Sequence, residues 1–166
     1  MTRLHVPVSL RWSDLDAYQH VNNVEMFRLL EDARITAFWE HPGAEDGEAW
    51  PTAVLATGPD APSHTLVAHQ EIEYLRPLGF TRHPVRVEMW IGHLGGASLD
   101  VCYEVHDGGP RFDRVGPSSG GRPYARATTT IVVVDARTGA PRRLAPAERA
   151  AWEPFLGEPI AFRRRS

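Results

Sequence analysis

The chain has 166 residues, 42% hydrophobic and 23% charged, which is the balance of an ordinary globular protein. This composition excludes a disordered tail and a fibrous protein, and the length predicts a single domain over residues 1–166. The net charge is −3 and all 18 basic residues are arginine, so Schiff-base chemistry on a lysine and a P-loop lysine are excluded. Without a broad basic surface, a long apolar run or a secretory signal, we expect no nucleic-acid partner, no membrane insertion and a cytoplasmic location.

The first part of the chain predicts one strand followed by one long helix. Apolar residues alternate over 5–11 with the period of a half-buried strand. After a loop, Asn22 is a good N-cap, and Glu25 stands where it would complete a capping box. The helix should run to about Trp39, because Pro42 and Gly43 follow. Its apolar arc is wide, which indicates a helix largely enclosed by other structure.

The rest of the chain predicts four strands and a short helix. Residues 41–63 suit a variable loop with one short element around 53–56. Period-two alternation predicts the strands, and short turns between them favour an antiparallel meander. A last amphipathic helix with proline in its first turn is predicted at about 146–156. Together these elements predict an α+β fold. The strand ranges are 65–76, 84–94, 97–106 and 123–135.

The densest polar cluster, DLDAYQHVNN at 14–23, stands directly before the long helix. The start of a helix presents unpaired N–H groups and a partial positive charge, so the amides of Asn23 and Val24 are suited to hold a developing oxyanion. Asp16, a few residues upstream, is suited to act as a carboxylate nucleophile or as a general base for water. This combination fits acyl transfer.

A plainer interpretation of the same cluster stays open. Asn22 then only caps the helix and His20 packs against its neighbours. Asp14 and Asp16 order a turn by accepting hydrogen bonds from backbone amides, as aspartates before helices often do.

The cluster resembles the matching motif of hotdog-fold acyl-CoA thioesterases of the 4-hydroxybenzoyl-CoA thioesterase type, and also that of plant acyl-carrier-protein thioesterases. Three further segments carry the resemblance: Glu31-Asp32-Ala33-Arg34 in the helix, IEYLRPL at 72–78 and TTTIVVVD at 128–135. The resemblance spans about residues 5–145. It implies a hotdog fold, in which an antiparallel sheet wraps around a central helix.

The resemblance also implies an enzyme of lipid metabolism that hydrolyses an acyl thioester, expected to be a fatty acyl-CoA, to free acid and thiol. No metal and no cofactor are expected. The catalytic aspartate of the family falls on Asp16, and the amide that polarises the thioester carbonyl falls on Asn23, with Val24 beside it. We expect His20 at the same centre, and four residues in contact with substrate: Asn22, Tyr18, Phe27 and Arg76.

The expected partner is acyl-CoA or an acyl-carrier protein, and the expected assembly is a homodimer or homotetramer, because a symmetric pair would cover the sheet edge. Many family members have glycine-rich residues after the catalytic aspartate, whereas this chain has Ala17-Tyr18-Gln19-His20. That departure favours the long-chain or carrier-protein-like branch. Two other classes remain alternatives: a non-catalytic acyl-CoA-binding hotdog module, and a hotdog hydroxyacyl-thioester dehydratase, which needs an Asp/His pair.

Two single residues have competing interpretations. Glu31 falls inside the apolar arc of the helix, where another hotdog branch has a catalytic carboxylate, but we expect it to pair with Arg34 or to lie at a subunit interface. Cys102 lies in an alternating run without an activating neighbour, so we expect it to pack in the core.

Two groups of charged residues have side chains of the kind that binding sites use. His69, Glu71 and Glu73 alternate along one strand face, which fits a metal site less well than a polar face or a dimer strand pair. Arg82 and the arginines at 163–165 match phosphate geometry, but solvated surface arginines are the default.

Overall fold

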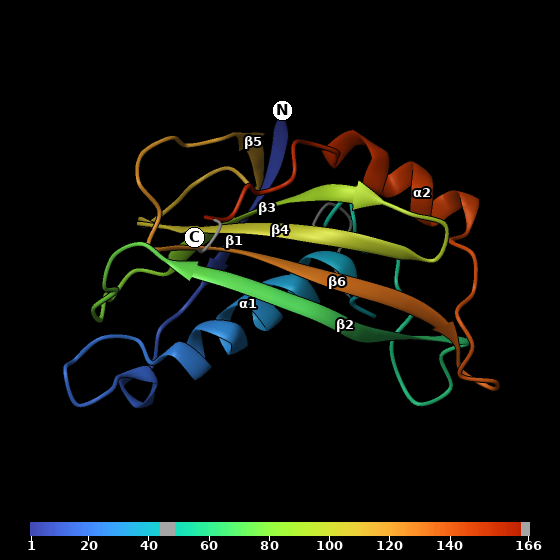
Figure 1. Cartoon of the computed structure of the whole chain (residues 1–166), viewed down its shortest axis with the longest axis horizontal. Coiled ribbons are helices and arrows are strands. Elements are labelled where there is room, and N and C mark those ends of the chain that lie inside the picture. Colours follow the sequence, from blue (N-terminus) through green and yellow to red (C-terminus); the bar gives the residue numbers. More distant parts are fainter. Residues whose placement is uncertain (44–48, 164–166) are drawn as a thin grey trace.

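The computed structural model describes residues 1–43 and 49–163, and it shows one antiparallel sheet with a long helix across one face (Figure 1). The predicted α+β class is confirmed, and each predicted strand is present within three residues of its expected bounds. The strands are β1 (Thr2–Val8), β2 (Ser63–Tyr74), β3 (Val85–Leu94), β4 (Ser98–His106), β5 (Val115–Pro117) and β6 (Ala125–Asp135). The helices are α1 (Asn23–Phe38) and α2 (Pro146–Trp152), with 3-10 turns at Trp12–Asp14 and Glu153–Phe155.

The strand order is β2-β6-β4-β3-β1-β5, so the predicted antiparallel meander is confirmed for β3, β4 and β6, with the β3–β4 hairpin turning at Gly95-Gly96, and is wrong for β2, which pairs with β6 instead of β3. The last long strand, β6, lies between β2 and β4 and pairs with both. β5 was not predicted, because it has three residues and no alternation, and it pairs with the start of β1. Alternation in a sequence identifies a strand and its buried face, but it does not identify the strand's partner.

α1 lies across the inner face of the sheet and buries the apolar side that the sequence predicts (Figure 1). Each apolar side chain of Leu, Met or Phe size that is fully buried here contributes about 1.5–3 kcal/mol to folding. Asn22 caps the helix, as predicted, and Trp39 ends it. The buried apolar residues of α1 are Met26, Leu29, Leu30, Ala33, Ala37 and Phe38.

The C-terminal part of the chain anchors the helix end and covers the outer face of the sheet. Trp152 is fully buried and its indole N–H donates to the carbonyl of Thr52 at 3.1 Å. α2 is shorter than predicted, because it passes into a 3-10 turn after Trp152. The segment that follows binds β3, where the Gly157 N–H donates to the Ile91 carbonyl at 2.9 Å, and reaches β2, where the Arg163 N–H donates to Glu73 at 2.5 Å.

Three smaller expectations are also resolved. Cys102 is buried, as predicted. The loop expected at 41–63 lies partly outside the described residues, and its short element near 53–56 is a single bridge between Trp39 and Leu55. No helix in the described ranges has the length and apolar character that crossing a membrane requires.

Candidate active site

The loop between the first 3-10 turn and α1 is closed by hydrogen bonds to Asp16. One carboxylate oxygen of Asp16, Oδ1, accepts from the main-chain N–H groups of Tyr18 at 2.8 Å and His20 at 3.1 Å. The Asp16 N–H in turn donates to the His20 carbonyl at 2.8 Å. Gln19 has a φ of 62°, in the left-handed region that costs glycine less conformational energy than other residues, and the loop makes its tight turn here without a glycine. Asp16 is therefore held in one place while its side chain stays half-buried.

Two main-chain N–H groups at the start of α1, those of Asn23 and Glu25, donate to no protein acceptor in the described part of the chain, and Asn23 is the one next to this loop. The Asn22 side chain accepts from the Val24 N–H at 2.9 Å, and the Asn22 carbonyl accepts from the Met26 N–H at 3.0 Å. Within the described residues the Asn23 N–H donates to no protein acceptor. The Val24 amide, predicted beside it as a second oxyanion donor, is already engaged by the N-cap.

The predicted capping box is wrong. The Asn22 N–H donates to the main-chain carbonyl of Asp14 at 2.8 Å, so it does not take the Glu25 carboxylate. Glu25 instead accepts from the Arg28 guanidinium at 2.6 Å and from Arg11 at 3.4 Å. Arginines on both sides draw the carboxylate away from the helix start, because a charge-assisted hydrogen bond is stronger than a neutral one.

A cleft of about 390 Å³ opens beside the loop and the helix start. His20 lines it from the loop, Met26 from α1 and Arg76 from the segment after β2. Arg76 stacks its guanidinium 3.5 Å from the ring centroid of Tyr124 and pairs with Asp107 at 2.8 Å, so it is held at the wall rather than free. The other lining residues are Val21, Tyr74, Leu75, Pro77 and Leu78.

A second hollow, of about 280 Å³, lies further along the helix between α1 and β2. Phe27 and Val24 line it from α1, and Val67 lines it from β2. Tyr18, in contrast, is 81% exposed on the outside of the loop. The structure thus gathers His20, Asn22 and Phe27 around one end of α1, while Tyr18 points to solvent.

Asp14 and Asp16 have different surroundings although they are two residues apart. The Asp14 side chain is fully buried and bound by Arg11 and Arg28. Burial opposes ionisation of Asp14, but the hydrogen bonds from Arg11 and the charges of Arg28 and Arg11 outweigh it and hold its pKa below the usual value. Asp14 is thus an ion-paired carboxylate with no exposed surface.

The helix carboxylate Glu31 lies outside the buried face of α1, contrary to the prediction from the helical pattern. Its side chain is 56% exposed and stands 3.6 Å from the Arg34 guanidinium, which is the predicted pairing. Arg34 is the residue that the helix buries instead, with its guanidinium donating to the Tyr103 hydroxyl at 3.2 Å.

The two groups of charged residues singled out in the sequence are only partly described. On β2, Glu73 pairs with Arg126 at 2.7 Å. The arginines at 164–165 lie outside the described residues.

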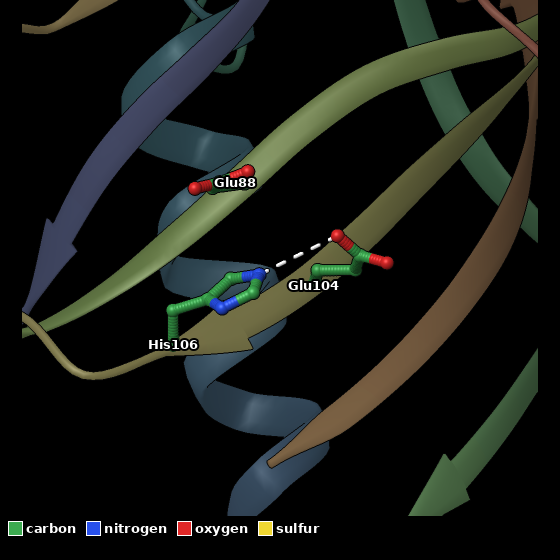
Figure 2. A group of neighbouring side chains, drawn as sticks. All are labelled: Glu88, Glu104 and His106. Carbon is green, nitrogen blue, oxygen red and sulfur yellow. Dashed lines mark hydrogen bonds and ion pairs between the residues drawn. The ribbon is translucent and has the colours of Figure 1, made fainter. Parts of the chain in front are cut away.

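The outer face of the sheet carries a charged cluster that the sequence interpretation missed. Figure 2 shows Glu104 and His106 together on β4, near Glu88 on β3, with α1 on the far side of the sheet. Their ligand atoms lie within 4.8 Å of one another, which among the described residues makes them the group suited to a metal ion. However, one guanidinium nitrogen of Arg3 contacts Glu88 at 2.9 Å and Glu104 at 2.5 Å. The cation between these two carboxylates is therefore Arg3.

This cluster has a partial signal in the sequence. Glu88, Glu104 and His106 each fall on the polar side of their strand's alternation. The alternation does not show that β3 and β4 place Glu88 opposite Glu104, or that β1 brings Arg3 beside them, because those contacts depend on strand register.

Comparison with known proteins identifies the class. Residues 10–160 match the model of the Thioesterase-like superfamily, so the chain belongs to that superfamily. The match covers the loop, the helix start and every strand except β1 and confirms the resemblance on which the sequence interpretation rests. Membership supports thioester hydrolysis as the general activity. A search of curated proteins gave no match.

Solved structures show the same hotdog fold. A thioesterase from Thermus thermophilus complexed with coenzyme A and Zn is 27% identical, with a TM-score of 0.63 over 94% of this chain and 96% of that one. A predicted thioesterase from Bacillus stearothermophilus is 18% identical, with a TM-score of 0.68 over 95% and 99%. A thioesterase superfamily member from Jannaschia sp. CCS1 is 18% identical, with a TM-score of 0.69 over 93% and 94%.

The outer-face cluster makes stability depend on acid. Burial opposes ionisation of Glu88, but hydrogen bonding from Ser119, the charge of His106 and a hydrogen bond from Arg3 outweigh it and lower its pKa below the ordinary 4.5. Because the folded-state pKa is the lower one, ionised Glu88 stabilises the fold above pH 4.5, and this stabilisation is lost as the pH falls through the folded-state pKa.

We therefore expect Glu88→Gln to lower the free energy of unfolding at pH 7 by about 1–3 kcal/mol, because Arg3 then keeps Glu104 as its carboxylate partner while Arg86 faces a neutral group. The variant should also lose less stability than the native protein between pH 5 and pH 3. Urea unfolding at several pH values measures both effects, with the exposed Glu153→Gln as control. Equal acid sensitivity of Glu88→Gln and native protein would contradict this account.

Proposed function

We propose that the protein hydrolyses an acyl-coenzyme A thioester, expected to carry a fatty acyl chain, with Asp16 as the catalytic carboxylate. The observation that carries the proposal is that hydrogen bonds hold a half-buried Asp16 in the loop directly before the helix start, where the Asn23 N–H has no protein acceptor, and that His20 and Val21 of the same loop line a cleft of about 390 Å³. The coenzyme A bound by the Thermus thermophilus relative supports this choice of thiol.

In this mechanism the thioester carbonyl oxygen accepts a hydrogen bond from the Asn23 N–H, which also brings the partial positive charge of the helix start. Asp16 either attacks the carbonyl carbon or removes a proton from the water that does so. In the general-base route the water oxygen bonds to the carbonyl carbon, Asp16 takes the water proton, and the tetrahedral oxyanion collapses to free acid as the C–S bond breaks and the thiolate takes up a proton. In the nucleophile route an Asp16 oxygen bonds to that carbon and the thiolate leaves, which gives an acyl–aspartyl anhydride, and water then hydrolyses this anhydride to release the acid and restore the Asp16 carboxylate. The Val24 N–H strengthens the site only when it leaves the Asn22 side chain.

The hollow between α1 and β2 is the proposed place for the acyl chain. Val24, Phe27 and Val67 form its apolar side next to the helix start, and the rest of its lining is polar: Arg28, Glu31, Arg34 and Gln70. His20 and Arg76 line the neighbouring cleft, where they are placed to contact the thiol part of the substrate. A dehydratase, which needs an Asp/His pair, is less well supported, because the contact between Asp16 and His20 in the described structure is with the His20 main-chain N–H and not with its imidazole ring.

Replacing Asp16 tests the catalytic assignment. We expect Asp16→Asn to lower kcat for acyl-CoA hydrolysis by roughly 10²–10⁴-fold, because the amide can neither attack nor accept a proton, while the shape of the loop is kept. Thiol release from a panel of acyl-CoAs, followed with a thiol reagent, is the measurement. The same panel shows which acyl chains the protein accepts.

The matched control is Glu31→Gln, which removes the exposed helix carboxylate and should leave most of the activity. A fully active Asp16→Asn together with an inactive Glu31→Gln would move the catalytic role to the helix. Binding of acyl-CoA without turnover would identify an acyl-binding module, and hydration of an enoyl-CoA would identify a dehydratase.

We also propose that two copies of the chain associate through β2. β2 is an edge strand of the described sheet, and its Leu66, Val67 and Tyr74 are 54%, 49% and 48% exposed. On the neighbouring side of α1, Val24 and Ile35 are 69% and 45% exposed. An open edge flanked by apolar side chains on a helix and a strand is a surface that a second copy would cover.

Light scattering measures this association. The native protein should have at least twice the 18.5 kDa mass of one chain, and Val67→Arg should shift it towards one chain by placing a charge at the interface. Val115→Arg is the control, since Val115 lies on β5 at the opposite edge and is 38% exposed. A native mass of 18.5 kDa at micromolar concentration would sink the proposal.

A further inference from the structure

We propose that Asp14 is a positioning residue that sets the place of Asp16 relative to the Asn23 amide. This inference rests on the proposed role of Asp16. Asp14 has no exposed surface, so substrate does not reach it, and any effect on the reaction passes through the residues that it holds.

The Asp14 carboxylate is bound from two directions. Its Oδ2 accepts from the Arg11 main-chain N–H at 2.7 Å and lies 2.9 Å from the Arg28 guanidinium. Its Oδ1 accepts from Arg11 Nε at 3.1 Å and lies 3.0 Å from Arg11 Nη2. Arg11 belongs to the segment after β1 and Arg28 to the second turn of α1, so one buried carboxylate connects the entry of the loop to the helix.

The main chain of Asp14 closes the loop at its neck. Its carbonyl accepts from the Asn22 N–H at 2.8 Å, and the next residues inward, Leu15 and Val21, form an antiparallel bridge. Inside that bridge, the Asp16 N–H donates to the His20 carbonyl, and the His20 N–H donates to the Asp16 carboxylate. Asp16 is thus two residues from one side of the neck, and Asn23 is one residue from the other side.

Arg28 has two other carboxylate partners, and neither is a residue of the loop. Glu25 at 2.6 Å and Asp32 at 2.5 Å both belong to α1 itself. The Asp14 contact is the one that ties Arg28 to the catalytic loop. Among the described residues, loss of the Asp14 charge leaves the 3.4 Å contact between Arg11 and Glu25 as the charged link between the loop entry and α1, and that link is longer and more exposed than the Asp14 contact with Arg28 at 2.9 Å. A displacement of about 1 Å between reacting groups is enough to slow a reaction by roughly 10²-fold.

A double-mutant cycle on kcat tests the proposal. We expect Asp14→Asn to lower kcat by roughly 10- to 100-fold with little change in KM, because the geometry of the reacting groups changes more than the substrate surface does. In the Asp16→Asn background the same replacement should change the remaining rate by no more than about twofold, since the group it positions is already gone. Asp32→Asn is the matched control: it removes an exposed partner of the same Arg28 and should leave kcat unchanged.

The rates are measured below the melting temperature of each variant, with circular dichroism confirming the folded fraction. If Asp14→Asn does not fold, Arg28→Gln removes the contact between Arg28 and Asp14 from the helix side. Arg28→Gln then replaces Asp14→Asn in the double-mutant cycle. An equal loss in the presence and absence of Asp16 would overturn the Asp14 proposal alone. Native activity of Asp16→Asn by itself would overturn both the catalytic assignment and the proposal that rests on it.

Discussion

Burial of the apolar side of α1 against the inner face of the sheet is the constraint on which the other features of this protein depend. Leu29, Ala33 and Ala37 have no exposed surface, and that contact fixes both the axis and the rotation of the helix. The free N–H of Asn23 therefore has one position relative to the sheet. The cleft beside it exists because the loop before the helix and the segment after β2 meet at that end, through the bridge between His20 and Gly79.

The loop illustrates how environment separates two carboxylates that are close in sequence. Asp14 lies at the neck of the loop, where Arg11 and Arg28 balance its charge and both of its carboxylate oxygens contact their guanidinium groups. Asp16 lies at the tip, where one oxygen accepts two main-chain amides and the side chain stays half-buried. The first arrangement stabilises structure, and the second keeps a carboxylate available for chemistry. Neither role follows from residue type, because both are aspartates before a helix.

The outer face of the sheet shows a second use of arginine in a chain that has no lysine. Arg3 joins Glu88 and Glu104 across three strands, and its guanidinium lies 4.0 Å from the ring centroid of Trp90. A planar guanidinium suits this place because it contacts two carboxylates and an aromatic face at once, which an ammonium group does less well. The charged cluster is covered by the segment near Ser119, whose N–H donates to Glu88 at 3.0 Å.

The sequence by itself determined the five longer strands, the long helix, its N-cap and its buried side, because these follow from local alternation, helical period and capping chemistry. It also determined the superfamily, through a ten-residue motif whose members stand next to one another in the chain. The motif also predicts Asp16 and Asn23 as parts of one site, since few residues separate them.

Only the tertiary structure decided which strands are neighbours, and with that the insertion of β6 between β2 and β4 and the meeting of Arg3 with Glu88 and Glu104. It also decided that Arg34 rather than Glu31 is buried, and that Arg28 turns to Asp14 as well as to its helical neighbours. These contacts join residues far apart in the chain, or choose between side chains with similar helical positions. Their free energies depend on strand register, burial and the pairing of charges, which local patterns do not contain.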